Sequence, residues 1–367
     1  MAVENGSLSA LQAAASIKSI VDDRDIEALV RVADRLGDDD ALFALGALGV
    51  LASSLERHDR LANGSGRRGF GMANLPGLEM ALLAFGERTG RAPRDSAETA
   101  WLIDPPWNWT NSVGEARFGN AVRQAERCLG AAAEALLPIR QGLAQLKDSA
   151  DVLRFCAEQV EAYTRVQIEL NRNPFPEDFL MMRNFLGTLR VGGRDYEGPN
   201  ATYTRGWTGL DLAVGIVKPT FAEIALKRAS HMCPNDAAAI RDSVALPSIA
   251  DLTADLLGID RSAIRSATPG QVRGTSTLNG GGARAFLEAA RLSRATAMLV
   301  GVHWGAINKN LTEPVAKLSD EERTKLGVAP TGGVSGTGLR HTDELRKERQ
   351  AHFLAGPNMI SLIGGAP

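Results

Sequence analysis

The chain has 367 residues, of which 44% are hydrophobic and 23% charged, and its formal net charge is −2. This composition is typical of a folded globular protein, and the near-zero charge argues against nucleic-acid or anionic-membrane partners. Without a signal-like N-terminus or an apolar run of about 18 residues, we expect a cytoplasmic protein with no membrane association. Cys128, Cys156 and Cys233 are widely spaced without a CxxC, which argues against a disulfide framework and a structural zinc site.

Helical periodicity runs through most of the sequence. The predicted helices are, in chain order, residues 8–20, 25–36, 40–57, 76–90, 117–146, 150–172, 176–187, 207–231, 283–310 and 340–354. Strand patterns are scarce, except for short pieces near 188–197. We therefore predict an all-α fold whose two long helices between 117 and 172 form an antiparallel pair. Irregular stretches that begin at Asn63 and Pro105 suggest a smaller N-terminal helical region, residues 1–105, ahead of a main domain, residues 106–367.

His303 is the first candidate functional residue. In the predicted helix 283–310 it shares a face with apolar residues such as Leu299 and Ile307, so its imidazole points into the protein interior. Gly301 and Gly305 flank it, and each costs a helix about 0.8 to 1 kcal/mol relative to alanine. A flat group such as haem packed against the helix would explain these glycines. On this evidence alone, a core histidine and a metal ligand both remain open.

Several segments follow one another in a recognisable order. They are the helix from Pro174 to Arg183, the loop RVGGRDYEGP at 190–199, the segment 211–216, His303, and the loop Gly336-Thr337-Gly338. The series resembles the tryptophan/indoleamine 2,3-dioxygenase superfamily of haem proteins over roughly residues 115–355. Through its RVGG-x-x-Y-x-GP loop, the chain looks most similar to the monodechloroaminopyrrolnitrin synthase branch.

The resemblance implies a helical bundle of the indoleamine 2,3-dioxygenase type that encloses haem b, with His303 as the iron ligand. It also implies that Arg183 holds the carboxylate of an amino-acid substrate, because a guanidinium pairs bidentately with a carboxylate. Gly336, Thr337 and Gly338 match the loop that closes over the substrate, although Leu339 replaces the next glycine of that motif. Arg123 is a candidate for the opposite side of the haem.

Asp178 departs from the indole-cleaving relatives, which carry an aromatic residue five positions before the arginine. A carboxylate there suggests a substrate with a cationic side chain, such as L-arginine or L-lysine. The alternative is that Asp178 belongs to an acidic first helical turn that complements the helix dipole. Both interpretations stay open at the level of the sequence.

Together these features predict a haem-dependent oxygenase of specialised metabolism that hydroxylates the side-chain nitrogen of a cationic amino acid, with O2 or H2O2 as the oxidant. A monooxygenase is favoured over a dioxygenase. The alternatives are a tryptophan- or indole-type oxygenase or rearranging enzyme, a non-catalytic haem-binding protein, and a helical interaction protein without a cofactor. An external electron donor and a homo-oligomer are further expected partners, and His352 is expected at the surface of the final helix.

Overall fold

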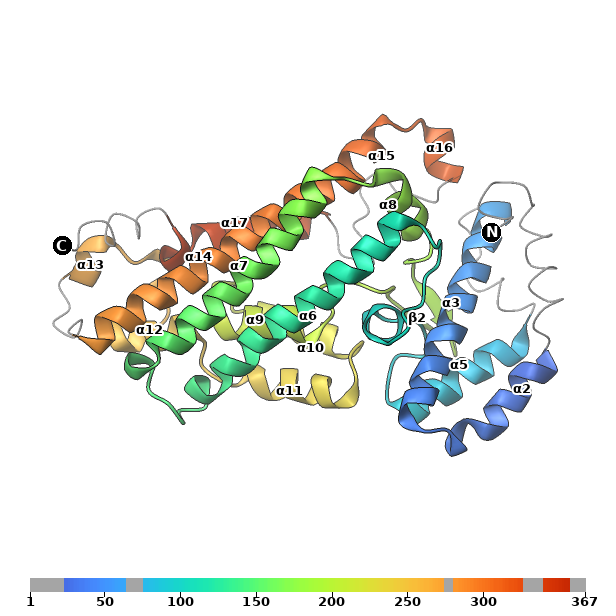
Figure 1. Ribbon diagram of the computed structural model, residues 1–367, viewed down its shortest axis with the longest axis horizontal. Helices are drawn as coiled ribbons and strands as arrows, with labels where there is room; N and C mark the ends of the chain where they lie inside the picture. Colours follow the sequence, from blue (N-terminus) through green and yellow to red (C-terminus); the bar gives the residue numbers. More distant parts are fainter. Residues whose placement is uncertain (1–22, 64–74, 274–279, 326–338, 357–367) are drawn as a thin grey trace.

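The computed structural model describes residues 23–63, 75–273, 280–325 and 339–356, and these residues form an assembly of helices with almost no sheet (Figure 1). The predicted all-α fold is therefore confirmed. The helix predicted at 8–20 and the loop Gly336-Thr337-Gly338 lie outside the described residues. No helix in the described ranges is long and apolar enough to cross a membrane.

The first helices of the described chain pack on one another at one end of the molecule (Figure 1). They are α2 (Asp23–Val32), the 3-10 turn η1 (Ala33–Arg35), α3 (Asp38–Asn63) and α5 (Pro76–Thr89). Their buried apolar residues share one cluster with Leu189 and Val191 of a later hairpin. The N-terminal helices thus pack against part of the predicted main domain, and the boundary at residue 105 stays a prediction.

Three long helices, α6, α7 and α14, run side by side and form the wall of the main bundle (Figure 1). The elements of this part are the π-helical turn η2 (Glu98–Leu102), α6 (Val113–Arg140), η3 (Leu146–Asp148), α7 (Ala150–Arg172), α8 (Pro176–Arg183), α14 (Gly281–Ile307), the π-helical turn η5 (Asn308–Thr312), α15 (Glu313–Lys317), α16 (Asp320–Lys325), α17 (Leu339–Ala351) and η7 (Phe353–Ala355). Their leucines and alanines bury a common core, as the amphipathic pattern predicts.

The helix predicted at 207–231 is broken in two. Helix α9 (Arg205–Val214) ends at Gly215, whose φ of 76° is left-handed, and α10 (Phe221–Ala229) starts after Pro219. A Cβ at Gly215 would lie 2.1 Å from Ser248 Oγ, so only glycine fits. Four shorter elements that the sequence did not predict follow, namely α11 (Pro234–Val244), α12 (Ile249–Leu257), η4 (Ile264–Ser266) and α13 (Pro269–Arg273).

The short strand pieces expected near 188–197 are confirmed as a hairpin of β1 (Leu189–Val191) and β2 (Arg194–Tyr196). Gly192 and Gly193 have φ values of 57° and 76°, as a tight two-residue turn requires. Gly192 N–H donates to Glu79 Oε1 at 2.6 Å, so the RVGG loop packs against α5.

Candidate functional site

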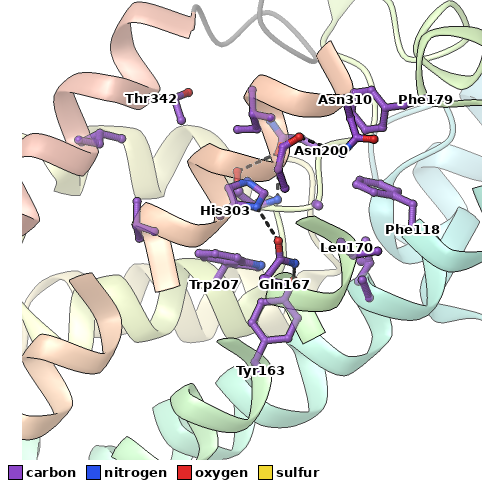
Figure 2. Close-up of a pocket in the computed structure, with 18 of the residues that line it drawn as sticks. Phe118, Tyr163, Gln167, Leu170, Phe179, Asn200, Trp207, His303, Asn310 and Thr342 are labelled. Carbon is purple, nitrogen blue, oxygen red and sulfur yellow. Dashed lines mark hydrogen bonds between the residues drawn. The ribbon is translucent and has the colours of Figure 1, made fainter. Parts of the chain in front are cut away.

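A pocket lies between α6, α7 and α14, and residues of α8, α9, α10, α17 and the segment 200–202 complete its wall. Figure 2 shows side chains from these elements converging on His303. The lining of the pocket is predominantly apolar, and its charged residues are Asp211, Arg228 and Arg349. The pocket is therefore an apolar chamber with one polarised wall, a composition typical of small-molecule sites.

His303 projects from α14 into this pocket and is half-buried. Its Nδ1 lies 3.2 Å from Gln167 Oε1 on α7, and its ring is 5.4 Å from that of Trp207 on α9 (Figure 2). Burial, with a smaller contribution from the positive charge of Arg349, lowers the pKa of His303 to about 4. The imidazole is therefore neutral at pH 7, which is the form that binds a metal ion.

The hydrogen bonds around Gln167 define which nitrogen of His303 carries the proton. Gln167 Nε2 donates to the hydroxyl of Tyr163 at 2.6 Å, so its Oε1 faces His303 and can only accept. The proton of the neutral imidazole accordingly lies on Nδ1. No described residue is hydrogen bonded to Nε2, and its lone pair is available to a ligand in the pocket.

One end of the pocket is aromatic. Phe118 of α6 and Phe179 of α8 meet edge to face with ring centroids 5.7 Å apart, and Phe175 meets Phe179 at 6.2 Å. Val122 and Ile307 extend the same apolar wall. Such a surface offers ring edges and methyl groups to a flat apolar molecule.

Another part of the pocket wall holds a buried ion pair. Arg349 Nε and Nη2 of α17 donate to the two carboxylate oxygens of Asp211 on α9 at 3.1 and 2.6 Å, and both residues are about 3% exposed. The sequence contained a signal for Asp211, a lone acid in an apolar helix. It contained none for Arg349, which lies in a helix rich in charges.

These residues suit a haem group. His303 offers a neutral imidazole with a free Nε2, and Gln167 holds the other ring nitrogen, as ligating histidines require. The apolar side chains would pack on the faces of a porphyrin. Neighbouring side chains also account for Gly301 and Gly305, because a Cβ there would lie 3.1 Å from Gln350 Nε2 and 3.3 Å from Asn171 Oδ1, so the packing of haem on these glycines stays a prediction.

Gln167 should tune the iron through His303. Replacing it with leucine removes the acceptor for Nδ1–H, and we expect roughly 10- to 100-fold weaker haem binding and a higher reduction potential. Gln167→Glu should instead lower the potential, because a carboxylate makes the imidazole a stronger electron donor. Haem transfer to apomyoglobin and spectroelectrochemistry measure both effects. A shift of the potential in the same direction in both variants would contradict this role.

Two predicted substrate residues lie outside the pocket lining. Arg183 ends α8, is half-buried, and its pKa is lowered to about 10 by burial. Asp178 in the first turn of α8 accepts a hydrogen bond from Gly114 N at 2.8 Å. Gly114 is the second residue of α6, so Asp178 satisfies a free N–H at the positive end of that helix dipole. This placement gives no support to Asp178 as the receptor for a cationic substrate.

Asp178→Ala should therefore change stability and leave ligand binding intact. We expect the free energy of unfolding to fall by about 1 kcal/mol, because α6 loses a capping acceptor. Urea denaturation measures this loss. Glu177→Ala is the matched control, because Glu177 is exposed on the same turn, and it should stay within about 0.5 kcal/mol of the parent. Loss of substrate affinity in Asp178→Ala at unchanged stability would restore the substrate role.

Arg123 and His352 have different environments from those expected. Arg123 of α6 donates to the carbonyls of Trp101 and Ile103 at 2.6 and 2.7 Å, so it anchors η2 and does not line the pocket. Gly336, Thr337 and Gly338 lie outside the described residues. His352, expected at the surface, is about 1% exposed, and its Nδ1 accepts from Leu354 N at the start of η7.

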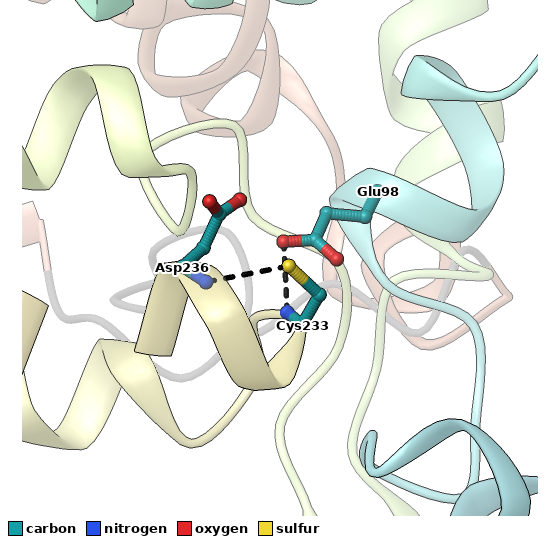
Figure 3. A group of neighbouring side chains, drawn as sticks. All are labelled: Glu98, Cys233 and Asp236. Carbon is teal, nitrogen blue, oxygen red and sulfur yellow. Dashed lines mark hydrogen bonds between the residues drawn. The ribbon is translucent and has the colours of Figure 1, made fainter. Parts of the chain in front are cut away.

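A second group of ligand-type atoms lies away from the pocket. Glu98, Cys233 and Asp236 approach one another at the N-terminus of α11 (Figure 3). Cys233 N–H donates to Glu98 Oε1 at 3.0 Å, and Asp236 N–H donates to Cys233 Sγ at 3.4 Å. Arg91 Nε pairs with the other oxygen of Glu98 at 3.1 Å. These contacts describe a helix cap that is closed by its own hydrogen bonds.

A model of the family described as monodechloroaminopyrrolnitrin synthase PrnB matches residues 12–352 of the chain. The match spans the helices that carry Gln167, Asp211 and His303 and all of α17, and thus every residue that lines the pocket. No curated protein matches the chain significantly.

Proposed function

Since the chain belongs to the monodechloroaminopyrrolnitrin synthase family of haem-dependent oxygenases of secondary metabolism, we propose that it oxidises an aromatic amino acid of the indole type. The observation that carries this proposal is the pocket itself. The neutral His303 faces an aromatic chamber, and the one acid among its described lining residues, Asp211, is paired with Arg349.

Within this pocket, His303 and Gln167 would hold haem b, which supplies an iron centre able to activate an oxidant. The protein's own contribution is orientation and exclusion of water. Phe118 and Phe179 offer rings against which an indole would pack, and the surrounding apolar side chains would exclude water from around it. The choice between O2 and H2O2 as oxidant stays a prediction.

An indole substrate fits the described lining better than L-arginine or L-lysine. A cationic side chain placed near His303 would need a carboxylate or several carbonyls to replace its lost hydration. Asp178 is held by α6 outside the pocket, and Asp211 already has a bidentate partner. The tryptophan- or indole-type alternative is therefore the function that we favour over nitrogen hydroxylation of a cationic amino acid.

Spectral titration of the haem-loaded protein tests this assignment. L-Tryptophan should shift the Soret band in a saturable manner, whereas L-arginine and L-lysine should leave the band unchanged. Phe179→Leu keeps an apolar side chain but removes the ring, and it should weaken L-tryptophan binding about 2- to 10-fold. A shift produced by L-arginine or L-lysine, with none from L-tryptophan, would overturn the indole assignment in favour of a cationic substrate.

A further inference from the structure

Arg228 is a buried cation of the pocket wall. It lies on α10, is about 6% exposed, and stacks over the rings of Phe221 and Tyr203 with its guanidinium carbon 5.3 and 5.8 Å from their centroids. Its Nε is fully buried without a hydrogen-bond partner among the described residues. Burial lowers the pKa of Arg228, yet an arginine remains protonated at neutral pH.

The acids near Arg228 are committed to other partners. Both carboxylate oxygens of Asp211 bind Arg349, and the oxygens of Glu197 bind the Tyr203 hydroxyl at 2.6 Å and Lys227 Nζ at 2.5 Å. The segment 326–338 that precedes α17 contains no aspartate or glutamate. Asp211 also attracts Arg228 electrostatically, but it is the sole acid among the described lining residues and faces two arginines, so the charged lining residues sum to one net positive charge.

A buried charge without a partner is costly, and proteins retain such a group where a ligand supplies the counter-charge. A guanidinium matches a carboxylate in shape, with two parallel N–H donors. The pocket that Arg228 lines also contains His303, so a carboxylate bound there belongs to a molecule held close to His303. Arg183, which the family resemblance suggested for this task, does not line the pocket.

We propose that Arg228 is the carboxylate receptor of this pocket and binds either the α-carboxylate of the amino-acid substrate or a propionate of haem. This inference rests on the proposed function, which supplies both candidate carboxylates. The ion pair with Arg349 occupies both carboxylate oxygens of Asp211, so Arg228 is the lining cation without a hydrogen-bonded acid among the described residues.

Two measurements on Arg228→Met, ligand affinity and the rate of haem loss, distinguish a substrate carboxylate from a haem propionate. Arg228→Lys is a second variant that keeps the positive charge. If the substrate supplies the carboxylate, Arg228→Met should bind L-tryptophan about 10- to 100-fold more weakly, while tryptamine, which lacks the carboxylate, binds as it does to the parent. If haem supplies it, Arg228→Met should lose haem faster than the parent, and haem dimethyl ester should bind both proteins equally. Arg228→Lys should lie between the parent and Arg228→Met.

Measurements on the apoprotein test Arg228 whether or not the protein binds haem. The Arg228→Met apoprotein should resist urea at least as well as the parent, because the variant removes an unpaired buried charge. Calorimetry of L-tryptophan against tryptamine on the apoprotein tests the substrate arm even if the parent binds no haem. Unchanged haem retention together with unchanged discrimination between L-tryptophan and tryptamine would overturn the proposal. So would a marked loss of apoprotein stability, which would show that Arg228 is paired within the protein.

Discussion

His303→Ala should weaken haem binding by more than about 100-fold and abolish the Soret band of the protein purified with haem supplied. Loss of an outer partner of a metal ligand already costs 10- to 100-fold in affinity, and loss of the ligand itself should cost more. His303 is the sole histidine among the described residues that line the pocket, so no neighbouring imidazole can take its place. The absorption spectrum measures this directly.

The control for this variant is His352→Asn. His352 is also a buried histidine, but it caps η7, and asparagine can accept the same hydrogen bond from Leu354 N. We expect this variant to keep the Soret band. Free imidazole added to His303→Ala should restore part of the band, because the substitution leaves space where the ring was. A Soret band of parental intensity in His303→Ala would remove His303 as the ligand.

Asp211→Asn should lower the free energy of unfolding of the apoprotein by about 3 to 5 kcal/mol. The substitution leaves the charge of Arg349 buried without a counter-ion, next to the equally buried Arg228, and breaking one partner of a buried pair typically costs this much. Urea denaturation followed by circular dichroism measures the change.

Two further variants test the cause of this loss. Asp255→Asn removes the acid of an exposed pair with Arg261 and should change stability by less than about 1 kcal/mol. The double variant Asp211→Leu/Arg349→Met replaces both charges with apolar groups and should recover most of the stability. A cost in Asp211→Asn no larger than that in Asp255→Asn would show that the buried pair contributes little.

Local patterns predicted most elements correctly. The 3.6-residue periodicity located α6, α7 and α14, and it placed His303 on an inward face. The pattern did not reveal the break between α9 and α10. Gly215 is required there because Ser248, 33 positions later in the chain (248 minus 215), leaves no room for a Cβ. It also could not decide whether Asp178 faced a substrate or a helix end, since the answer depends on Gly114 of α6.

The sequence by itself determined the helical class, the inward-facing His303 and the family of the chain, because these depend on local periodicity and on motif order. The tertiary structure decided which side chains these residues contact. Gln167 meets His303 across 136 positions, and Asp211 meets Arg349 across 138. Helix α17 carries Arg349, and its sequence is rich in charged residues. Its packing against α14 brings Arg349 into the pocket wall. The local sequence shows which side chains are charged and which face of a helix is apolar. The partner of a buried charge is decided only when helices from distant parts of the chain pack together.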